Sequence, residues 1–137
     1  MERSSPDALV DYLARYDSLV EVGIGRRTDV VGRLAAAGKR VTATDVRQRS
    51  VPDGVRFVED DIVARAEAVD GGGDPGPIYA VDAVYARNLP PELHRPARDV
   101  AHAAGADFLF TTLGGDQPAV PVERVTLPRE TLYVAVR

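Results

Sequence analysis

The sequence predicts a single α/β domain over residues 1–137, with a mostly parallel twisted sheet, helices on both faces and an antiparallel C-terminal strand pair. Three observations lead to this fold class. Short β-branched runs alternate with helical patterns through five strands, as in βαβ units. A glycine turn, Gly23-Ile24-Gly25, follows the first strand directly. The last two strands, 122–127 and 131–136, are joined by Pro128-Arg129-Glu130, which leaves no room for a crossover helix.

The first part of the chain supplies two helices and three strands. Apolar residues at helical spacing predict a helix that ends near residue 16 and a second that begins at Thr28-Asp29 and stops at Gly38. Their inward positions are Ala8, Leu9, Tyr12, Leu13 and Tyr16, then Val30, Val31, Leu34, Ala35 and Ala36. Apolar, β-branched runs predict strands at 18–22, 40–45 and 55–58.

The second part continues the alternation. A short helix at 62–69 precedes a loop rich in glycine and proline, 70–77. Strands are expected at 79–86 and 107–113. The helix between them should run from Pro91 to Ala104, with Leu93, Ala97, Val100 and Ala101 turned inward. Its two histidines, His94 and His102, lack nearby cysteine and are expected on the helix surface rather than in a metal site.

Composition narrows the function classes. A length of 137 residues fits one domain, and a hydrophobic fraction of 45% is ordinary for a globular protein. The absence of cysteine excludes disulfides and thiolate catalysis. No apolar run could cross a bilayer and the N-terminus lacks a signal-peptide core, so we expect a cytoplasmic protein without membrane contact.

The net charge of −4 disfavours a strong general affinity for nucleic acid, although a local arginine patch could still contact RNA. Arginine dominates the basic residues, because Lys39 is the one lysine in the sequence.

The turn at Gly23 and Gly25 predicts the ligand-binding turn of a Rossmann-like βαβ unit. Glycine lets backbone N–H groups approach a ligand closely, and the following helix N-terminus adds partial positive charge. Glu21 stands two residues before Gly23, where dinucleotide-binding strands usually carry an apolar residue. Arg27 and Thr28 occupy the positions where a third glycine is usual, so a tight turn without a ligand is the alternative interpretation.

Polar residues follow each of the first three strands, and ligands of parallel sheets bind at these carboxyl ends. The candidates are Glu21, Gly23, Gly25, Asp45, Asp60 and Asp61. We expect Asp45 to accept hydrogen bonds from ribose hydroxyls and Asp61 to bind an adenine amino group. Such acids favour cationic S-adenosylmethionine over NAD, whose phosphates they would repel. The alternatives are a solvated acid at Asp45 and a cap of the helix at Ile62 for Asp61.

Arg87-Asn88-Leu89-Pro90-Pro91 follows the fourth strand. Some methyltransferases carry Asn or Asp, then Pro-Pro and an aromatic residue here, and the Asn holds the amine that is methylated. This chain inserts Leu89 and has Glu92 in the aromatic position. Arg87 and Asn88 are therefore candidates to face an acceptor, while prolines that only shape a loop are the alternative.

The chain resembles class I S-adenosylmethionine-dependent methyltransferases in its first motif, and it resembles a small uncharacterised archaeal protein family, number 0146, over nearly its whole length. The segments that carry this resemblance are Leu19–Gly25, Val41–Asp45, Asp60-Asp61, Ala83–Leu93, His94–Ala97, Gly105–Asp107 and Leu113–Asp116. In that family the fourth strand usually leads into Ser-Ile-Arg-Pro-Pro; here Arg87 keeps the arginine, but Asn88-Leu89 separates it from the prolines. The resemblance implies a Rossmann-like fold, S-adenosylmethionine as cofactor, and a small molecule, RNA or protein as methyl acceptor.

Two other functions stay open at this point. The first is a non-catalytic nucleotide-binding or scaffold module, and the second is an NAD-dependent oxidoreductase, which Glu21 disfavours. The chain has no length left for a separate substrate domain, so a second copy or another partner could complete the site.

Overall fold

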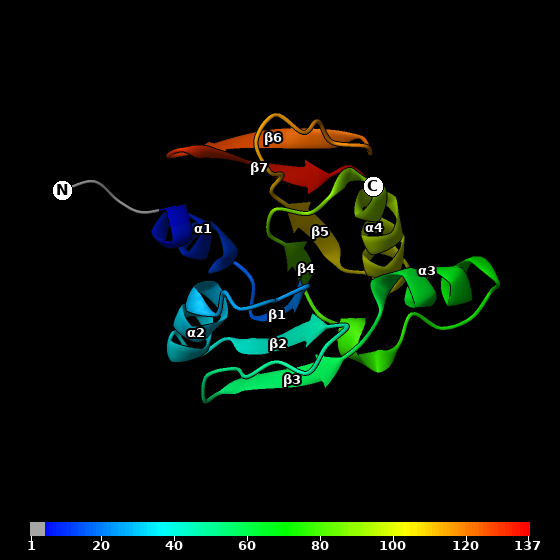
Figure 1. Cartoon of the computed structure of the whole chain (residues 1–137), viewed down its shortest axis with the longest axis horizontal. Coiled ribbons are helices and arrows are strands. Elements are labelled where there is room, and N and C mark those ends of the chain that lie inside the picture. Colours follow the sequence, from blue (N-terminus) through cyan, green and yellow to red (C-terminus); the bar gives the residue numbers. More distant parts are fainter. Residues whose placement is uncertain (1–4) are drawn as a thin grey trace.

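The computed structural model describes residues 5–137, in which seven strands form one sheet in the order β3-β2-β1-β4-β5-β7-β6 (Figure 1). The strands are β1 (Ser18–Val22), β2 (Arg40–Asp45), β3 (Val55–Glu59), β4 (Ala83–Ala86), β5 (Asp107–Phe110), β6 (Val122–Leu127) and β7 (Glu130–Ala135). Strands β1 to β5 are parallel, and β7 is antiparallel to both β5 and β6. The predicted fold class is therefore confirmed.

Helices cover both faces of the sheet, with α1 and α2 on one side and α3 and α4 on the other (Figure 1). Their bounds are α1 (Ser5–Leu13), α2 (Asp29–Ala36), α3 (Ile62–Asp70) and α4 (His94–Ala103), with short 3₁₀ turns η1 (Pro77–Tyr79) and η2 (Pro91–Leu93). Loops without a helix connect β2 to β3 and β5 to β6, at 46–54 and 111–121. None of the helices in residues 5–137 is long and apolar enough to cross a membrane.

Strand β1 is buried on both faces because it lies in the middle of the sheet. Leu19 packs in the cluster under α1 and α2, whereas Val20 and Val22 pack in the cluster under α3 and α4. Successive side chains of a strand point to opposite faces. Glu21 is therefore directed towards α1 and α2, on the same side as its register partner Tyr85 of β4.

Several boundaries differ from the sequence expectation because of long-range contacts. Helix α1 ends at Leu13, and the Tyr16 hydroxyl instead donates a hydrogen bond to Asp107 Oδ2 over 2.9 Å. Strand β4 begins at Ala83 rather than at residue 79, since Tyr79 lies in η1 and donates to Asp60 Oδ2 over 2.6 Å. Strand β5 ends at Phe110, and Ala36 at the end of α2 is exposed.

The expectation that His94 lies on the helix surface is wrong. Its side chain is fully buried and its ring lies 4.4 Å from the ring of Phe110, centroid to centroid. His94 Nδ1 accepts a hydrogen bond from the backbone N–H of Ala119 over 3.0 Å, so Nε2 carries the proton and donates to the Leu89 carbonyl over 2.8 Å. The imidazole therefore connects the loop after β4 to the loop before β6.

Candidate functional site

A cavity of about 330 Å³ lies at the carboxyl ends of β1, β2 and β3, where the loop after β4 closes one side. Its lining residues are Val22, Gly23, Thr44, Asp45, Val46, Asp60, Asp61, Ile62, Val63, Leu89 and Leu93. The volume is at the lower end of the roughly 300–1,000 Å³ of small-molecule pockets. Three of the predicted site residues, Gly23, Asp45 and Asp61, thus meet at one cavity, together with the additional candidate Asp60.

The glycine turn presents open backbone to this cavity. Gly23 has a φ of +71° and Gly25 a φ of +56°, which L-residues with side chains rarely adopt. No heavy atom lies within 4 Å of the place where a Cβ of Gly23 would stand. A ligand can therefore approach the peptide at Gly23, whereas Gly25 lines a neighbouring cavity on the other side of the turn.

Asp45 connects the first two strand ends. Its Oδ2 accepts a hydrogen bond from Gly25 N–H over 2.8 Å, and its Oδ1 accepts one from Arg47 N–H over 3.0 Å. Burial raises the pKa of Asp45, but these backbone donors and the nearby Arg49 guanidinium outweigh burial and hold the pKa below its usual value. Asp45 is thus a carboxylate that fixes the glycine turn and still has free lone pairs.

Asp60 and Asp61 have different structural roles. Asp60 accepts hydrogen bonds from the Tyr79 hydroxyl and from Arg65 Nε, the latter over 3.2 Å. Asp61 caps α3, because its Oδ1 accepts from Val63 N–H over 2.9 Å. Both carboxylates also line the cavity, so a cap and a ligand contact are compatible for Asp61. Across residues 5–137, no group of three or more His, Asp or Glu residues is placed to hold a metal ion.

The predicted set of residues leaves out the apolar walls of the cavity. Val46 and Val63 stand out because they are 62% and 39% exposed at its mouth. Most of these walls directly flank predicted residues: Val22 precedes Gly23, Val46 follows Asp45, and Ile62 and Val63 follow Asp61. Leu89 likewise follows the predicted Asn88. Reading the neighbours of each strand-end residue would have found these walls, whereas Leu93 had no comparable signal.

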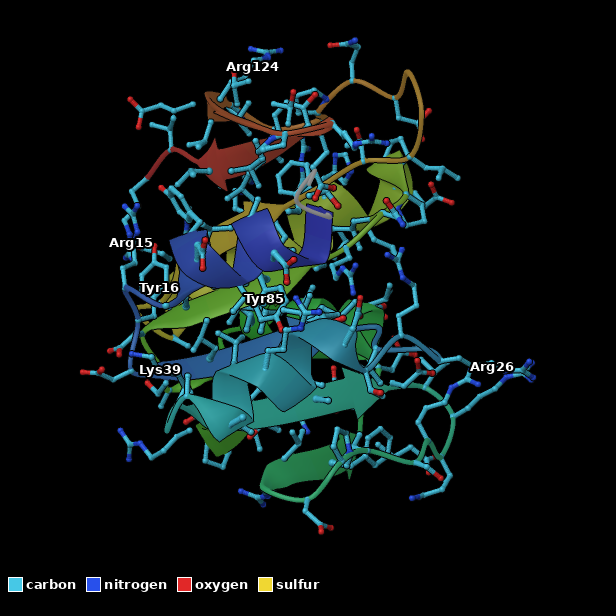
Figure 2. The ribbon with its side chains drawn as sticks, turned by 90° about the vertical axis from the view of Figure 1, so that its left-hand side faces the viewer. Arg15, Tyr16, Arg26, Lys39, Tyr85 and Arg124 are labelled. Carbon is cyan, nitrogen blue, oxygen red and sulfur yellow. The ribbon has the colours of Figure 1, made fainter. Side chains whose placement is uncertain are left out.

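Glu21 lies beside the cavity but on the other face of the sheet. Its side chain is 1% exposed, and burial raises its pKa to about 8 against the opposing effects of Tyr85 and Arg87. Within residues 5–137, neither Glu21 Oε1 nor the Tyr85 hydroxyl makes a well-oriented hydrogen bond. Figure 2 shows Tyr85 between α1 and α2, the side towards which Glu21 is directed. A direct contact between Glu21 and a ligand stays a prediction.

Arg87 and Asn88 do not line the cavity. Arg87 Nη1 pairs with Asp29 Oδ1 over 2.6 Å at the start of α2, and the Arg87 side chain is only 8% exposed. Asn88 has a φ of +52°, and its N–H donates to Thr111 Oγ1 over 2.9 Å. Both residues therefore shape the loop after β4, and their contact with an acceptor stays a prediction.

Comparisons with known proteins identify relatives over the whole domain. The model of an uncharacterised protein family, UPF0146, matches residues 6–137. A UPF0146 protein of Halobacterium salinarum is 46% identical over 133 residues, covering 96% of this chain and 97% of its own. A UPF0146 protein of Archaeoglobus fulgidus is 37% identical over 110 residues, covering 79% and 78%.

Solved structures with the same fold are S-adenosylmethionine-dependent methyltransferases. An RNA methyltransferase from Salinibacter ruber, in complex with S-adenosyl-L-homocysteine, has a TM-score of 0.64 and 18% identity, covering 98% of this chain and 92% of that chain. The magnesium protoporphyrin IX methyltransferase of Synechocystis PCC 6803, with bound SAM, has a TM-score of 0.60 and 14% identity, covering 96% and 78%. This chain spans only 37% of the bifunctional kinase-methyltransferase WbdD, at a TM-score of 0.58 and 15% identity.

At these identities the structural likeness establishes the fold alone, while the sequence matches establish the family. The chain belongs to the uncharacterised protein family UPF0146, which has archaeal members, and it has a methyltransferase-like α/β fold.

Proposed function

We propose that this protein binds S-adenosylmethionine in the cavity at the ends of β1, β2 and β3, and that it directs methyl transfer to an acceptor. The observation that carries the proposal is the shared cavity of Gly23, Asp45 and Asp61, which combines open backbone, carboxylates and apolar walls. The solved structures with bound cofactor or its product S-adenosylhomocysteine support the choice of ligand by fold.

Each lining group has a defined task in this proposal. The backbone at Gly23 lets the cofactor approach without Cβ interference. Asp45 accepts from a ribose hydroxyl through Oδ1, which uses one lone pair on Arg47 N–H and retains another, while Oδ2 accepts from Gly25 N–H and lies 3.6 Å from Arg49 Nε. Asp60 and Asp61 accept from the adenine amino group, and Ile62 packs against the base.

Electrostatics favour this cofactor over a dinucleotide. Carboxylates at the ends of β2 and β3 suit a ligand that carries a positive sulfonium and repel the phosphates of NAD. S-adenosylmethionine, when bound, supplies a methyl group on that sulfur. Methyl transfer depends mainly on the alignment of two reactants, so the protein's contribution is to position them and exclude water. The roles of Glu21, Arg87 and Asn88, and a cytoplasmic location, stay predictions.

Calorimetric titration with S-adenosylmethionine, S-adenosylhomocysteine and NAD tests the proposal. We expect S-adenosylhomocysteine to bind, and Asp45→Ala to weaken binding by about tenfold or more, as loss of a hydrogen-bonded carboxylate contact would. Asp53→Ala is the control, because Asp53 is an exposed acid on the loop that follows β2. Thermal melts of both variants separate lost binding from lost folding.

The other outcomes discriminate among functions. Binding of neither S-adenosylmethionine nor S-adenosylhomocysteine would contradict the proposal and favour a scaffold module. Tight binding of NAD would favour an oxidoreductase.

A further inference from the structure

A second cavity of about 360 Å³ lies on the far side of the glycine turn from the proposed cofactor cavity. Its lining residues are Gly25, Arg26, Thr28, Gln48, Arg49 and Ser50. It lies between the turn after β1 and the loop after β2, two segments that Asp45 joins through its hydrogen bond from Gly25 N–H. Its side-chain donors are guanidinium, hydroxyl and amide groups, and no carboxylate lines it.

Two arginines on the loops that form this cavity are available to a ligand: Arg26, which lines it, and Arg47, which lies on the loop after β2. Arg26 and Arg47 are exposed, and neither guanidinium has a hydrogen bond or ion pair within residues 5–137. Figure 2 shows Arg26 extended away from the sheet. By contrast, Arg33, Arg65, Arg87, Arg98 and Arg137 each pair with an aspartate. In a chain of net charge −4, Arg26 and Arg47 place two exposed guanidinium groups on the two loops that adjoin this cavity.

Arg49 lines the cavity together with Arg26, whereas Arg47 lies on the same loop as Arg49 but is not one of the lining residues. The Arg49 Nε lies 3.6 Å from Asp45 Oδ2, which is an ion-pair distance, and this Nε is buried without a hydrogen-bond partner in residues 5–137. The Asp45 carboxylate offsets the charge of Arg49, while the exposed Arg26 and Arg47 have no such partner. The arginines therefore retain net positive charge towards the solvent.

We propose that Arg26, Arg47 and Arg49 form a binding surface for the phosphate backbone of a single-stranded nucleic acid, which we call the arginine rim. Guanidinium forks bind phosphate oxygens in pairs, and the hydroxyls of Thr28 and Ser50 and the amide of Gln48 are further donors to phosphate and sugar. One or two guanidinium groups are enough to bind one phosphate. Three guanidinium groups on two loops suit the successive phosphates of a nucleic-acid strand.

The arginine rim lies next to the proposed cofactor cavity. Asp45 separates the rim from the proposed cofactor cavity, so a strand held by the arginines would pass beside the proposed site of the cofactor ribose. Nucleic acid as the methyl acceptor rests on the proposed function, whereas the phosphate contact does not. The small number of arginines and the acidic remainder of the chain limit the affinity and make it depend on salt.

Fluorescence anisotropy with a short, labelled, mixed-sequence RNA tests the rim in the full chain. Three phosphate contacts on a single strand predict a slope of log affinity against log salt of about −2 between about 50 and 200 mM KCl. We expect the double variant R26A/R47A to lose about tenfold or more in affinity and to have a slope nearer zero. Calorimetry with S-adenosylhomocysteine should be unchanged in this variant.

R40A/R56A is the matched control. It removes the same charge, and Arg40 and Arg56 line a different cavity, near the amino ends of β2 and β3. An equal loss of RNA affinity in this control, or no loss in R26A/R47A, overturns the rim. Complete displacement of the RNA by AMP at equal phosphate concentration also overturns it, because the occupant would then be a mononucleotide.

These experiments can contradict either proposal without contradicting the other. RNA binding that depends on Arg26 and Arg47 without any binding of S-adenosylhomocysteine supports the rim and contradicts the proposed function. Binding of S-adenosylhomocysteine without RNA binding supports the proposed function and contradicts the rim.

Discussion

Glu21 of β1 and Tyr85 of β4 are register partners whose polar groups are both buried on the side of α1 and α2. Burial is the largest cause of the rise in the pKa of Glu21, and it also raises the pKa of Tyr85 well above its usual value. A carboxyl group in the centre of the sheet with an oxygen that lacks a partner is costly when ionised. The pair therefore couples folding to pH.

The first prediction concerns Glu21→Gln. The pKa of Glu21 rises from 4.5 to about 8 on folding, so the folded state holds the proton more tightly. The free energy that protonated Glu21 contributes to folding is fully present below about pH 4.5 and is lost as the pH rises towards 8. The loss amounts to about 1.36 kcal/mol for each unit of pKa shift. We expect Glu21→Gln to match the wild type near pH 4 and to be more stable by a few kcal/mol near pH 9.

Urea denaturation across this pH range measures the difference. Glu67→Gln is the control, because it removes the same charge from the exposed side of α3. A difference between Glu21→Gln and wild type that stays constant with pH would show that Glu21 is not the coupled group.

The second prediction separates the two roles of Asp61. Asp61→Ala removes the cap of α3 and should cost about 1 kcal/mol of stability, whereas Asp61→Ser keeps a capping oxygen and should cost less. Both variants remove the carboxylate from the cavity, so both should weaken S-adenosylhomocysteine binding. Binding that falls only in the alanine variant would mean that Asp61 acts as a cap alone.

The third prediction uses two glycines that both have a positive φ. Gly23→Ala and Gly38→Ala each place a Cβ at a positive φ, +71° and +85°, and each should cost roughly 1–2 kcal/mol of stability. Gly23 lines the cavity and Gly38 does not. We therefore expect calorimetry to show lost S-adenosylhomocysteine binding in Gly23→Ala alone. Equal affinity in the two variants would rule out a close approach of ligand to the glycine turn.

The fourth prediction concerns the buried imidazole of His94. His94→Ala leaves a cavity beside Phe110 and leaves Ala119 N–H and the Leu89 carbonyl without their partner, so we expect a loss of about 3 kcal/mol. His102→Ala on the half-buried side of α4 should cost less than about 1 kcal/mol. Denaturant unfolding of both variants checks the contrast, and equal losses would contradict it.

The sequence predicted those parts of the fold that depend on local pattern. Strands 18–22, 40–45 and 122–127 have the predicted bounds, because their β-branched runs end at glycine, acid or proline. The strand-end rule likewise placed Gly23, Asp45 and Asp61 at one edge of the sheet, where they line one cavity, whereas the predicted Glu21 and Gly25 do not line it and cofactor binding stays a prediction. These successes share a cause, since parallel strands bring their carboxyl ends to one edge whatever the remaining side chains are.

Features that depend on distant partners could not be read in this way. His94 contacts Ala119 across 25 residues, and Tyr79 leaves its expected strand to bond Asp60. The face of the sheet towards which Glu21 points is a third feature that could not be predicted. Because β1 is apolar on both sides of the sheet, alternation does not reveal which helical layer its one carboxyl group meets.

Because His94 has a single tautomer, its imidazole can report whether the cavity is occupied. Its Nε2 proton is bonded to the carbonyl of Leu89, whose side chain forms part of the cavity wall. A molecule that enters the cavity and displaces Leu89 changes the length of that bond, and the nitrogen resonance of the imidazole responds. Occupancy could thus be followed by nuclear magnetic resonance with ring-labelled histidine, without attaching a dye to the ligand or altering the chain.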